Sequence, residues 1–96
     1  MAINRGFIEI LQKANNDGPT RFNDFTKIVI KRTALSSATV SKRLNELIAI
    51  KAMDQVITKS KFRRGVITYK VTDKGKKIIK LAIELQHMVD FKNDAD

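Results

Sequence analysis

"LSSATVSKRLNELIAI", residues 35–50, joins a polar start to regularly spaced aliphatic side chains. The aliphatic positions at helical spacing are Val40, Leu44, Leu47 and Ile48. This spacing predicts a helix over about residues 37–50, with one buried face and one polar face. Ser36 or Ser37 can cap the helix, because a serine hydroxyl accepts hydrogen bonds from free backbone N–H groups. What the polar face contacts depends on the neighbouring segments.

A first helix is predicted near the N-terminus. Apolar side chains recur there at helical spacing, at Ile3, Phe7, Ile10, Leu11 and Ala14. Gly18 and Pro19 then favour a turn, because Gly permits unusual backbone angles and Pro cannot continue a helix. This first helix is therefore predicted over about residues 3–15.

A second helix is predicted directly before the opening stretch. Its apolar side chains are Phe22, Phe25, Ile28 and Val29. They would share one face of a helix over about residues 23–32, with Asn23 as the N-cap. Residues 20–22 can form a short extended segment before it. Residues 33–35 make a tight connection, so the second and third helices form a helix-turn-helix.

The hydrophobic period changes after the third helix. Apolar side chains then alternate with a period of two, at Ile67, Tyr69 and Val71. This alternation and the many β-branched residues are typical of strands, and Gly65 permits a chain reversal. We predict a hairpin with strands near residues 54–60 and 66–72. A final helix is predicted over about residues 73–92, with Thr72 as its cap.

Length and composition indicate a single globular domain over residues 1–96. The apolar fraction of 43% and the charged fraction of 30% favour a soluble fold over disorder. The sequence contains no cysteine, which excludes disulfides and thiolate metal sites. We find no apolar run long enough for a membrane span and no secretion signal, so we expect a cytoplasmic protein without membrane contact.

The charge distribution favours a polyanionic partner. The formal net charge is +9, and residues 27–80 alone carry +12. Residues 1–26 are neutral and residues 81–96 carry −3. A concentrated positive field of this kind is typical of nucleic-acid binding, whereas charge that serves only solubility would be spread more evenly.

The order of the predicted elements defines a fold class. Three helices, a β-hairpin and a final helix make an α+β protein, mainly α with one hairpin. A hairpin directly after a helix-turn-helix is a wing, so the sequence predicts a winged helix-turn-helix, with a possible short strand before the second helix.

The segments "RFNDF", "LSSATVSKRLNELIAIKAM" and "TYKVTDKGKKI" together resemble small prokaryotic winged-helix regulators. The similarity is to the HxlR-like and MarR-like transcription factors of bacteria and archaea, over about residues 20–82. Those families usually have Gly-Leu after the third helix, where this chain has Ala52 and Met53. The resemblance implies a dimer that binds two half-sites of double-stranded DNA and regulates transcription, with repression as the commoner mode.

The predicted DNA-binding positions of the third helix are Ser36, Ser37, Ala38, Thr39, Ser41, Lys42, Arg43 and Asn45. The residues at the helix start can bind a phosphate, because free N–H groups and hydroxyls meet there. Lys42 and Asn45 can bind base edges, and Arg43 can reach a backbone phosphate. Alternatively, the serines only cap the helix, and Lys42 and Arg43 are merely solvated.

The predicted wing supplies the other DNA-binding positions, namely Lys59, Lys61, Arg63 and Arg64. We expect them to contact phosphates or an adjacent minor groove, although a charged hairpin tip can also be plain solvated surface. Lys27, Lys31 and Arg32 of the second predicted helix can contact the DNA backbone as well.

The final helix carries a predicted dimer interface, formed by Ile78, Leu81, Leu85, Met88 and Val89. This apolar stripe could instead pack against the first helix of the same chain. A rival interpretation of the whole protein is a winged-helix module that binds another protein through this stripe, and a weaker one is non-specific binding of nucleic acid.

Catalytic and metal chemistry is not indicated. His87 is the only histidine, and a metal site needs several ligands. No Gly-rich phosphate loop or nucleophile motif is present. We therefore expect neither an enzyme nor a bound cofactor, and the sequence does not identify an effector, an operator or the regulated genes.

Overall fold

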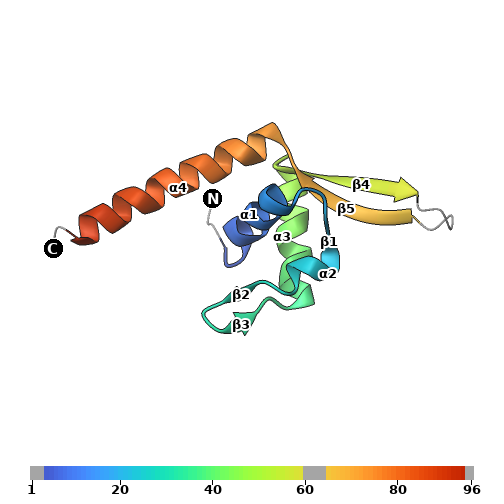
Figure 1. Cartoon of the computed structure of the whole chain (residues 1–96), viewed down its shortest axis with the longest axis horizontal. Helices are drawn as coiled ribbons and strands as arrows, with labels where there is room; N and C mark the ends of the chain where they lie inside the picture. Colours follow the sequence, from blue (N-terminus) through green and yellow to red (C-terminus); the bar gives the residue numbers. More distant parts are fainter. Residues whose placement is uncertain (1–3, 60–64, 95–96) are drawn as a thin grey trace.

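The computed structural model of the chain describes residues 4–59 and 65–94. The elements in chain order are α1 (Phe7–Asp17), β1 (Thr20–Arg21), α2 (Phe22–Phe25), β2 (Val29–Ile30), β3 (Thr33–Ala34), α3 (Ser37–Ala49), β4 (Met53–Lys59), β5 (Gly65–Val71) and α4 (Asp73–Asp94). Figure 1 shows α4 and the β4–β5 hairpin extending from the body in opposite directions. This arrangement confirms the predicted α+β winged helix.

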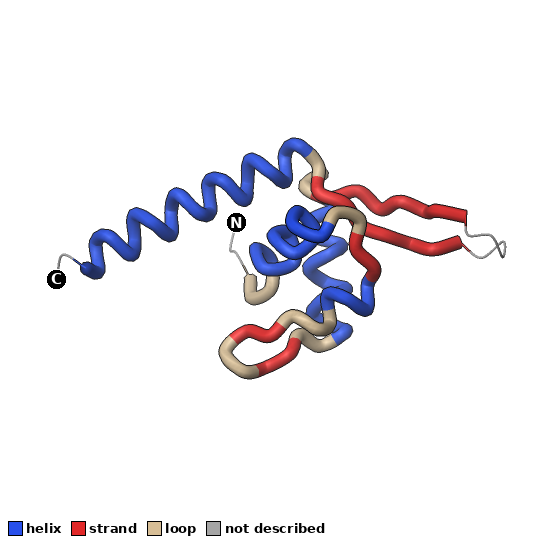
Figure 2. Tube along the Cα trace, in the orientation of Figure 1, coloured by secondary structure: helices blue, strands red, loops and turns tan. Residues whose placement is uncertain are grey.

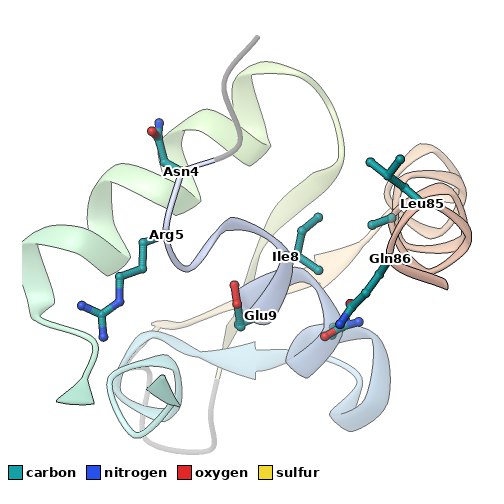
Figure 3. Close-up of a pocket in the computed structure, with 8 residues that line it drawn as sticks. Asn4, Arg5, Ile8, Glu9, Leu85 and Gln86 are labelled. Atoms are coloured by element: carbon teal, nitrogen blue, oxygen red, sulfur yellow. The ribbon is translucent and has the colours of Figure 1, made fainter. Parts of the chain in front are cut away.

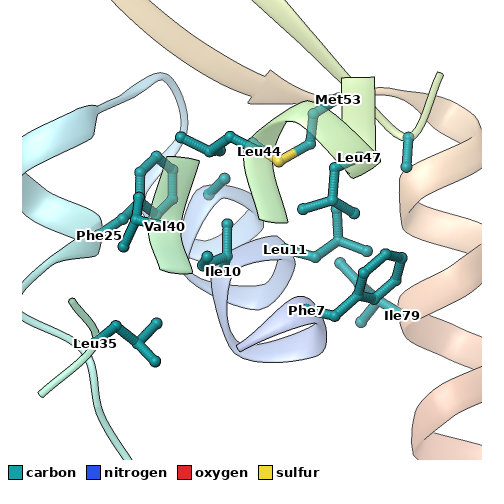
Figure 4. Close-up of a cluster of buried hydrophobic side chains, with 12 residues drawn as sticks. Phe7, Ile10, Leu11, Phe25, Leu35, Val40, Leu44, Leu47, Met53 and Ile79 are labelled. Carbon is teal, nitrogen blue, oxygen red and sulfur yellow. The ribbon is translucent and has the colours of Figure 1, made fainter. Parts of the chain in front are cut away.

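The core lies between α1, α3 and the start of α4 (Figure 4). Its buried apolar side chains are Phe7, Ile10, Leu11, Ala14, Phe25, Leu35, Val40, Leu44, Leu47, Ala52, Met53 and Ile79. Full burial of a Leu, Ile or Phe side chain contributes about 1.5–3 kcal/mol each. Phe25 also meets Tyr69 of β5 edge-on, with ring centroids 6.1 Å apart. The core therefore fixes α3 against α1 and connects α2 to the wing.

The wing belongs to a three-stranded antiparallel sheet of order β1-β5-β4. Thr20 of β1 pairs with Tyr69, and Met53 of β4 pairs with Val71. Strand β1 confirms the predicted short extended segment before the second helix. β1 is the next element after α1, and it pairs with β5. The base of the wing is therefore connected to α1 through β1 as well as to α3 through β4.

Thr72 joins the wing to α4, as predicted for a cap. Its Oγ1 accepts a hydrogen bond from the backbone N–H of Gly75 at 3.1 Å and donates to the carbonyl oxygen of Lys51 at 2.6 Å. Its backbone N–H donates to the carbonyl oxygen of Ala52 at 3.0 Å. Thr72 thus provides an acceptor for a backbone N–H at the start of α4 and holds this helix beside the turn that follows α3.

The predicted helix over residues 23–32 is wrong. Only Phe22–Phe25 is helical, and a second hairpin, β2–β3, follows. Ile28 and Ile30 pack against the core while Val29 is 61% exposed, which is the period of a strand. The β-branched run from residue 28 to 30 favours that extended backbone.

The other boundaries differ by a few residues. α1 begins at Phe7 rather than residue 3, because Gly6 takes a left-handed conformation at φ 89° directly before it. Asn23 is not a cap, since Arg21 occupies the cap position of α2 without a side-chain hydrogen bond. Among the described residues, we find no helix with both the length and the apolar character needed to cross a membrane.

Candidate nucleic-acid interface

One face of α3 is polar and exposed. Its exposed side chains are Ser37, Ala38, Ser41, Lys42, Asn45 and Ala49, and Thr39 is half-buried beside them. The opposite face packs into the core through Val40, Leu44 and Leu47, each at most 2% exposed. The structure thus gathers most of the predicted DNA-binding positions of this helix on one surface.

Ser36 caps α3, as the sequence predicts. Its backbone is extended, with φ −72° and ψ 156°. Its Oγ accepts a hydrogen bond from the backbone N–H of Thr39 at 3.1 Å and donates to the Thr39 hydroxyl at 3.0 Å. The Ser36 hydroxyl is therefore engaged in holding the helix start, which favours the capping role over a direct ligand role.

Arg43 does not lie on the polar face of α3. The residue is 9% exposed, and its Nη2 donates to Oε1 of Glu46 at 2.9 Å in an ion pair. Position 43 is three residues after Val40 and four before Leu47, so the helical period turns it toward the core. The ion pair and the burial together hold this guanidinium at the core edge, away from the exposed side chains of α3. We therefore exclude Arg43 from the proposed interface.

The wing positions are only partly described. Lys59 is the last residue of β4, where its backbone pairs with Gly65. The predicted contacts Lys61, Arg63 and Arg64 lie outside the described residues. The two strands place this end of the hairpin far from α4 (Figure 1).

The basic residues after α2 occupy a hairpin instead of the predicted helix. Lys31 and Arg32 form its two-residue turn, and both are exposed. Lys27 lies before the hairpin and pairs with Asp24 at 3.8 Å. Sequence reasoning missed this element, because a two-residue turn is usually signalled by Asn-Gly or Asp-Gly rather than by Lys-Arg.

Arg5 also has a structural role that the sequence did not indicate. Its Nη2 donates to the carbonyl oxygen of Ile30 at 2.9 Å and to that of Thr33 at 3.4 Å. These two carbonyls belong to the residues on either side of the hairpin turn. The interaction spans at least 25 residues of sequence, so no local pattern could have indicated it.

The predicted dimer residues of α4 have different environments. Ile78 is half-buried against the core. Leu81, Leu85 and Met88 are 63%, 58% and 68% exposed, and Ile83 is 53% exposed. The side chain of Val89 lies outside the described residues. The start of α4 therefore closes the core of this chain, whereas Leu81, Ile83, Leu85 and Met88 face solvent.

A groove of about 510 Å³ separates α4 from the start of α1 (Figure 3). Ile8 lines it from α1, Leu85 and Gln86 line it from α4, and Asn4 and Arg5 line it from the segment before α1. The groove continues into a smaller apolar depression between Ile8 and Leu81. An apolar helix face and an open groove thus lie side by side. Within the described ranges, we find no cluster of three His, Cys, Asp or Glu side chains that could hold a metal ion.

The fold and the polar face of α3 define a winged-helix protein. No protein-family model and no curated protein matches the sequence. Solved structures do match: the chain is similar to the reduced form of the transcriptional regulator YodB from B. subtilis. The identity is 22% and the TM-score 0.70, over 91% of this chain and 79% of that chain.

Two PadR proteins have similar structures. For a PadR-like transcription factor from Bacteroides fragilis, the identity is 17% and the TM-score 0.71, over 95% of this chain and 88% of that chain. For a PadR family transcription regulator from Clostridium difficile, the corresponding values are 17% and 0.70, over 88% and 91%. The predicted resemblance is therefore confirmed for the winged-helix fold.

Proposed function

We propose that this protein is a dimeric transcriptional repressor that binds double-stranded DNA in a sequence-specific manner. The observation that carries the proposal is the polar, exposed face of α3, held from behind by a fully buried apolar face. An α-helix with its side chains is about 10–12 Å wide, and the major groove of B-DNA is about 12 Å wide. The helix therefore fits the groove with its polar side against the bases.

The side chains on this face have distinct proposed roles. Lys42 donates to base acceptors such as guanine O6 and N7, and Asn45 binds a base edge. Ser37, Thr39 and Ser41 contact phosphates or bases beside them, and Ala38 allows close approach. The winged-helix fold of the matched transcription regulators supports this arrangement.

The wing is proposed to hold the DNA backbone. Lys59, Lys61, Arg63 and Arg64 concentrate positive charge within six residues of the hairpin. Residues 27–80, which include α3 and the wing, carry +12 of the total charge. Such charge attracts the phosphate backbone and provides affinity that does not depend on sequence.

The exposed apolar face of α4 is proposed to form the dimer. Leu81, Leu85 and Met88 are exposed although they are large apolar side chains, which a monomer would leave in contact with water. A symmetric dimer buries the same face of both copies and places two α3 helices on one duplex. Repression would follow from occupation of a promoter, and the protein would act in the cytoplasm.

A DNA titration at several salt concentrations tests the proposal. The logarithm of the affinity is expected to fall linearly with the logarithm of salt, with a slope of about −0.9 per phosphate neutralised. A duplex selected from a random library is expected to contain an inverted repeat. No binding to any duplex at low salt would refute the proposal.

Lys42→Ala tests whether α3 is the reader. It is expected to reduce discrimination between the selected duplex and a scrambled one by about 1–3 kcal/mol. Lys80→Ala is the matched control, because Lys80 is exposed on α4 and the substitution removes one positive charge, as Lys42→Ala does. If Lys42→Ala, like the control, loses as much affinity for the selected duplex as for the scrambled one, α3 does not recognise the base sequence.

A further inference from the structure

The β2–β3 hairpin forms a second, shorter basic projection beside α3. Figure 2 shows it apart from the β4–β5 wing, on the other side of the body. Its strands pair Val29 with Ala34 and Ile30 with Thr33, so Lys31 and Arg32 are the whole turn. Ala34 lies only three residues before the start of α3 at Ser37. The hairpin is therefore directly continuous with the helix proposed to enter the major groove.

The turn itself is conformationally unfavourable for its residues. Lys31 has φ 50° and Arg32 has φ 70°, both in the left-handed region. A two-residue turn of this kind strongly prefers Asn-Gly, because side chains with a Cβ are strained at positive φ. Two long basic side chains thus occupy positions where the local backbone favours other residues. Strain of this kind clusters at functional sites.

The rest of the hairpin is built to hold this turn. Ile28 and Ile30 pack against the core, and the backbone N–H of Leu35 donates to the carbonyl oxygen of Ile28 at 3.0 Å. Arg5 donates to the carbonyl oxygens of Ile30 and Thr33, one on each side of the turn. The tip is therefore supported from the segment before α1 and from the core, while its two cationic side chains stay exposed.

The charge at the tip lacks a counter-charge in the described part of the chain. Neither Lys31 nor Arg32 forms an ion pair with another described residue, whereas Lys27 is paired with Asp24. Arg5, which lies below the turn, adds a third positive charge to the same place. The hairpin tip therefore presents the side chains of Lys31 and Arg32 to solvent.

We propose that the Lys31–Arg32 turn is a second backbone clamp, which binds phosphates of the same duplex that α3 reads, on the side of α3 away from the wing. The proposal rests on the proposed DNA-binding function. The wing and this turn would hold the duplex on both sides of the recognition helix. Because the turn contacts phosphates rather than base edges, it contributes affinity without sequence preference.

The variant K31N/R32G tests the proposal without endangering the fold. Asn-Gly suits the turn, so the variant is expected to unfold at a temperature a few degrees above that of the unchanged protein. It removes two cations, so the salt slope of DNA binding is expected to shrink by about 1.8 per bound protomer. K31R/R32K is the matched control, because it keeps both charges at the same strained positions and is expected to keep the slope.

The outcomes separate this proposal from the function on which it rests. If the unchanged protein binds no duplex, both are wrong. If it binds DNA and K31N/R32G retains the full slope, the clamp is wrong while the regulator function stands. An unchanged slope together with weaker dimerisation in sedimentation also overturns the clamp, because the turn would then contact the second subunit.

Discussion

The guanidinium of Arg5 lies 2.9 Å from the carbonyl oxygen of Ile30, so a residue two positions before α1 holds the backbone of the β2–β3 hairpin. These residues are 25 positions apart in sequence. The contact connects the N-terminal segment to the loop that leads into α3. Arg5 thus supports the segment between the four-residue α2 and the start of α3.

Arg5→Ala is expected to destabilise the protein by about 1 kcal/mol, because two carbonyl oxygens lose a charged donor at an exposed site. Urea unfolding measures this loss. Arg5→Lys is expected to recover part of it, since a lysine can keep one of the two contacts. Arg21→Ala, at an exposed position of β1, removes the same charge as a control. Equal losses for Arg5→Ala and Arg21→Ala would contradict a specific role of Arg5.

Ser36→Ala is expected to cost about 1 kcal/mol, the typical value for loss of an N-cap, because the Thr39 N–H loses its acceptor. Ser37→Ala is the matched control, since Ser37 is exposed at the first helical position. We expect the control to change stability by less than about 0.5 kcal/mol. Thermal unfolding of both variants decides the point, and a larger loss for Ser37→Ala would show that the cap has been misassigned.

Gly75→Ala is expected to destabilise the protein, although Ala normally stabilises a helix interior by about 1 kcal/mol relative to Gly. An added Cβ would collide with the carbonyl oxygen of Ala52 and lie 2.7 Å from Cγ1 of Val71. The sign of the change is therefore the test, measured by chemical denaturation. Lys74→Ala, one position earlier and exposed, is expected to be nearly neutral. A stabilised Gly75→Ala variant would show that α4 does not pack this closely.

Leu85→Lys is expected to shift the protein toward monomer without unfolding it, because Leu85 is 58% exposed on α4. Sedimentation over a range of concentrations measures the change. Ile79→Ala provides the contrast: Ile79 is 7% exposed, so its truncation is expected to cost about 2–5 kcal/mol through a cavity in the core. A Leu85→Lys protein that associates as strongly as the unchanged protein would remove α4 from the proposed interface.

Much of the fold was predictable because its signals are local. The spacing of Val40, Leu44 and Leu47 predicted the buried face of α3, and the period-two pattern around Tyr69 predicted the wing. Caps were predictable for the same reason: Ser36 and Thr72 bind backbone groups three residues away. The polar face of α3 then followed from geometry, since it lies opposite the apolar stripe.

The failures concern features that depend on distant contacts or on ambiguous periods. Phe22, Phe25, Ile28 and Val29 fit a helical face, but Ile28 and Ile30 bury themselves with the period of a strand. In an apolar run of about four to eight residues, the period alone does not distinguish a helix from a strand. The helical spacing places Arg43 nearer the core edge than Lys42, but it does not show that Glu46, one turn later, provides a partner there.

The hydrogen bonds of Thr72 to Lys51, Ala52 and Gly75 connect the start of α4 to the turn after α3. α4 contains 22 residues, which corresponds to a lever about 33 Å long. A tilt of only about 5° at this joint would move the far end of that lever by about 3 Å, given the same rise per residue. In the proposed dimer, the packing of the two α4 helices against each other would therefore set the distance between the two α3 helices. Small changes in that packing would alter the spacing of the DNA half-sites that the protein binds.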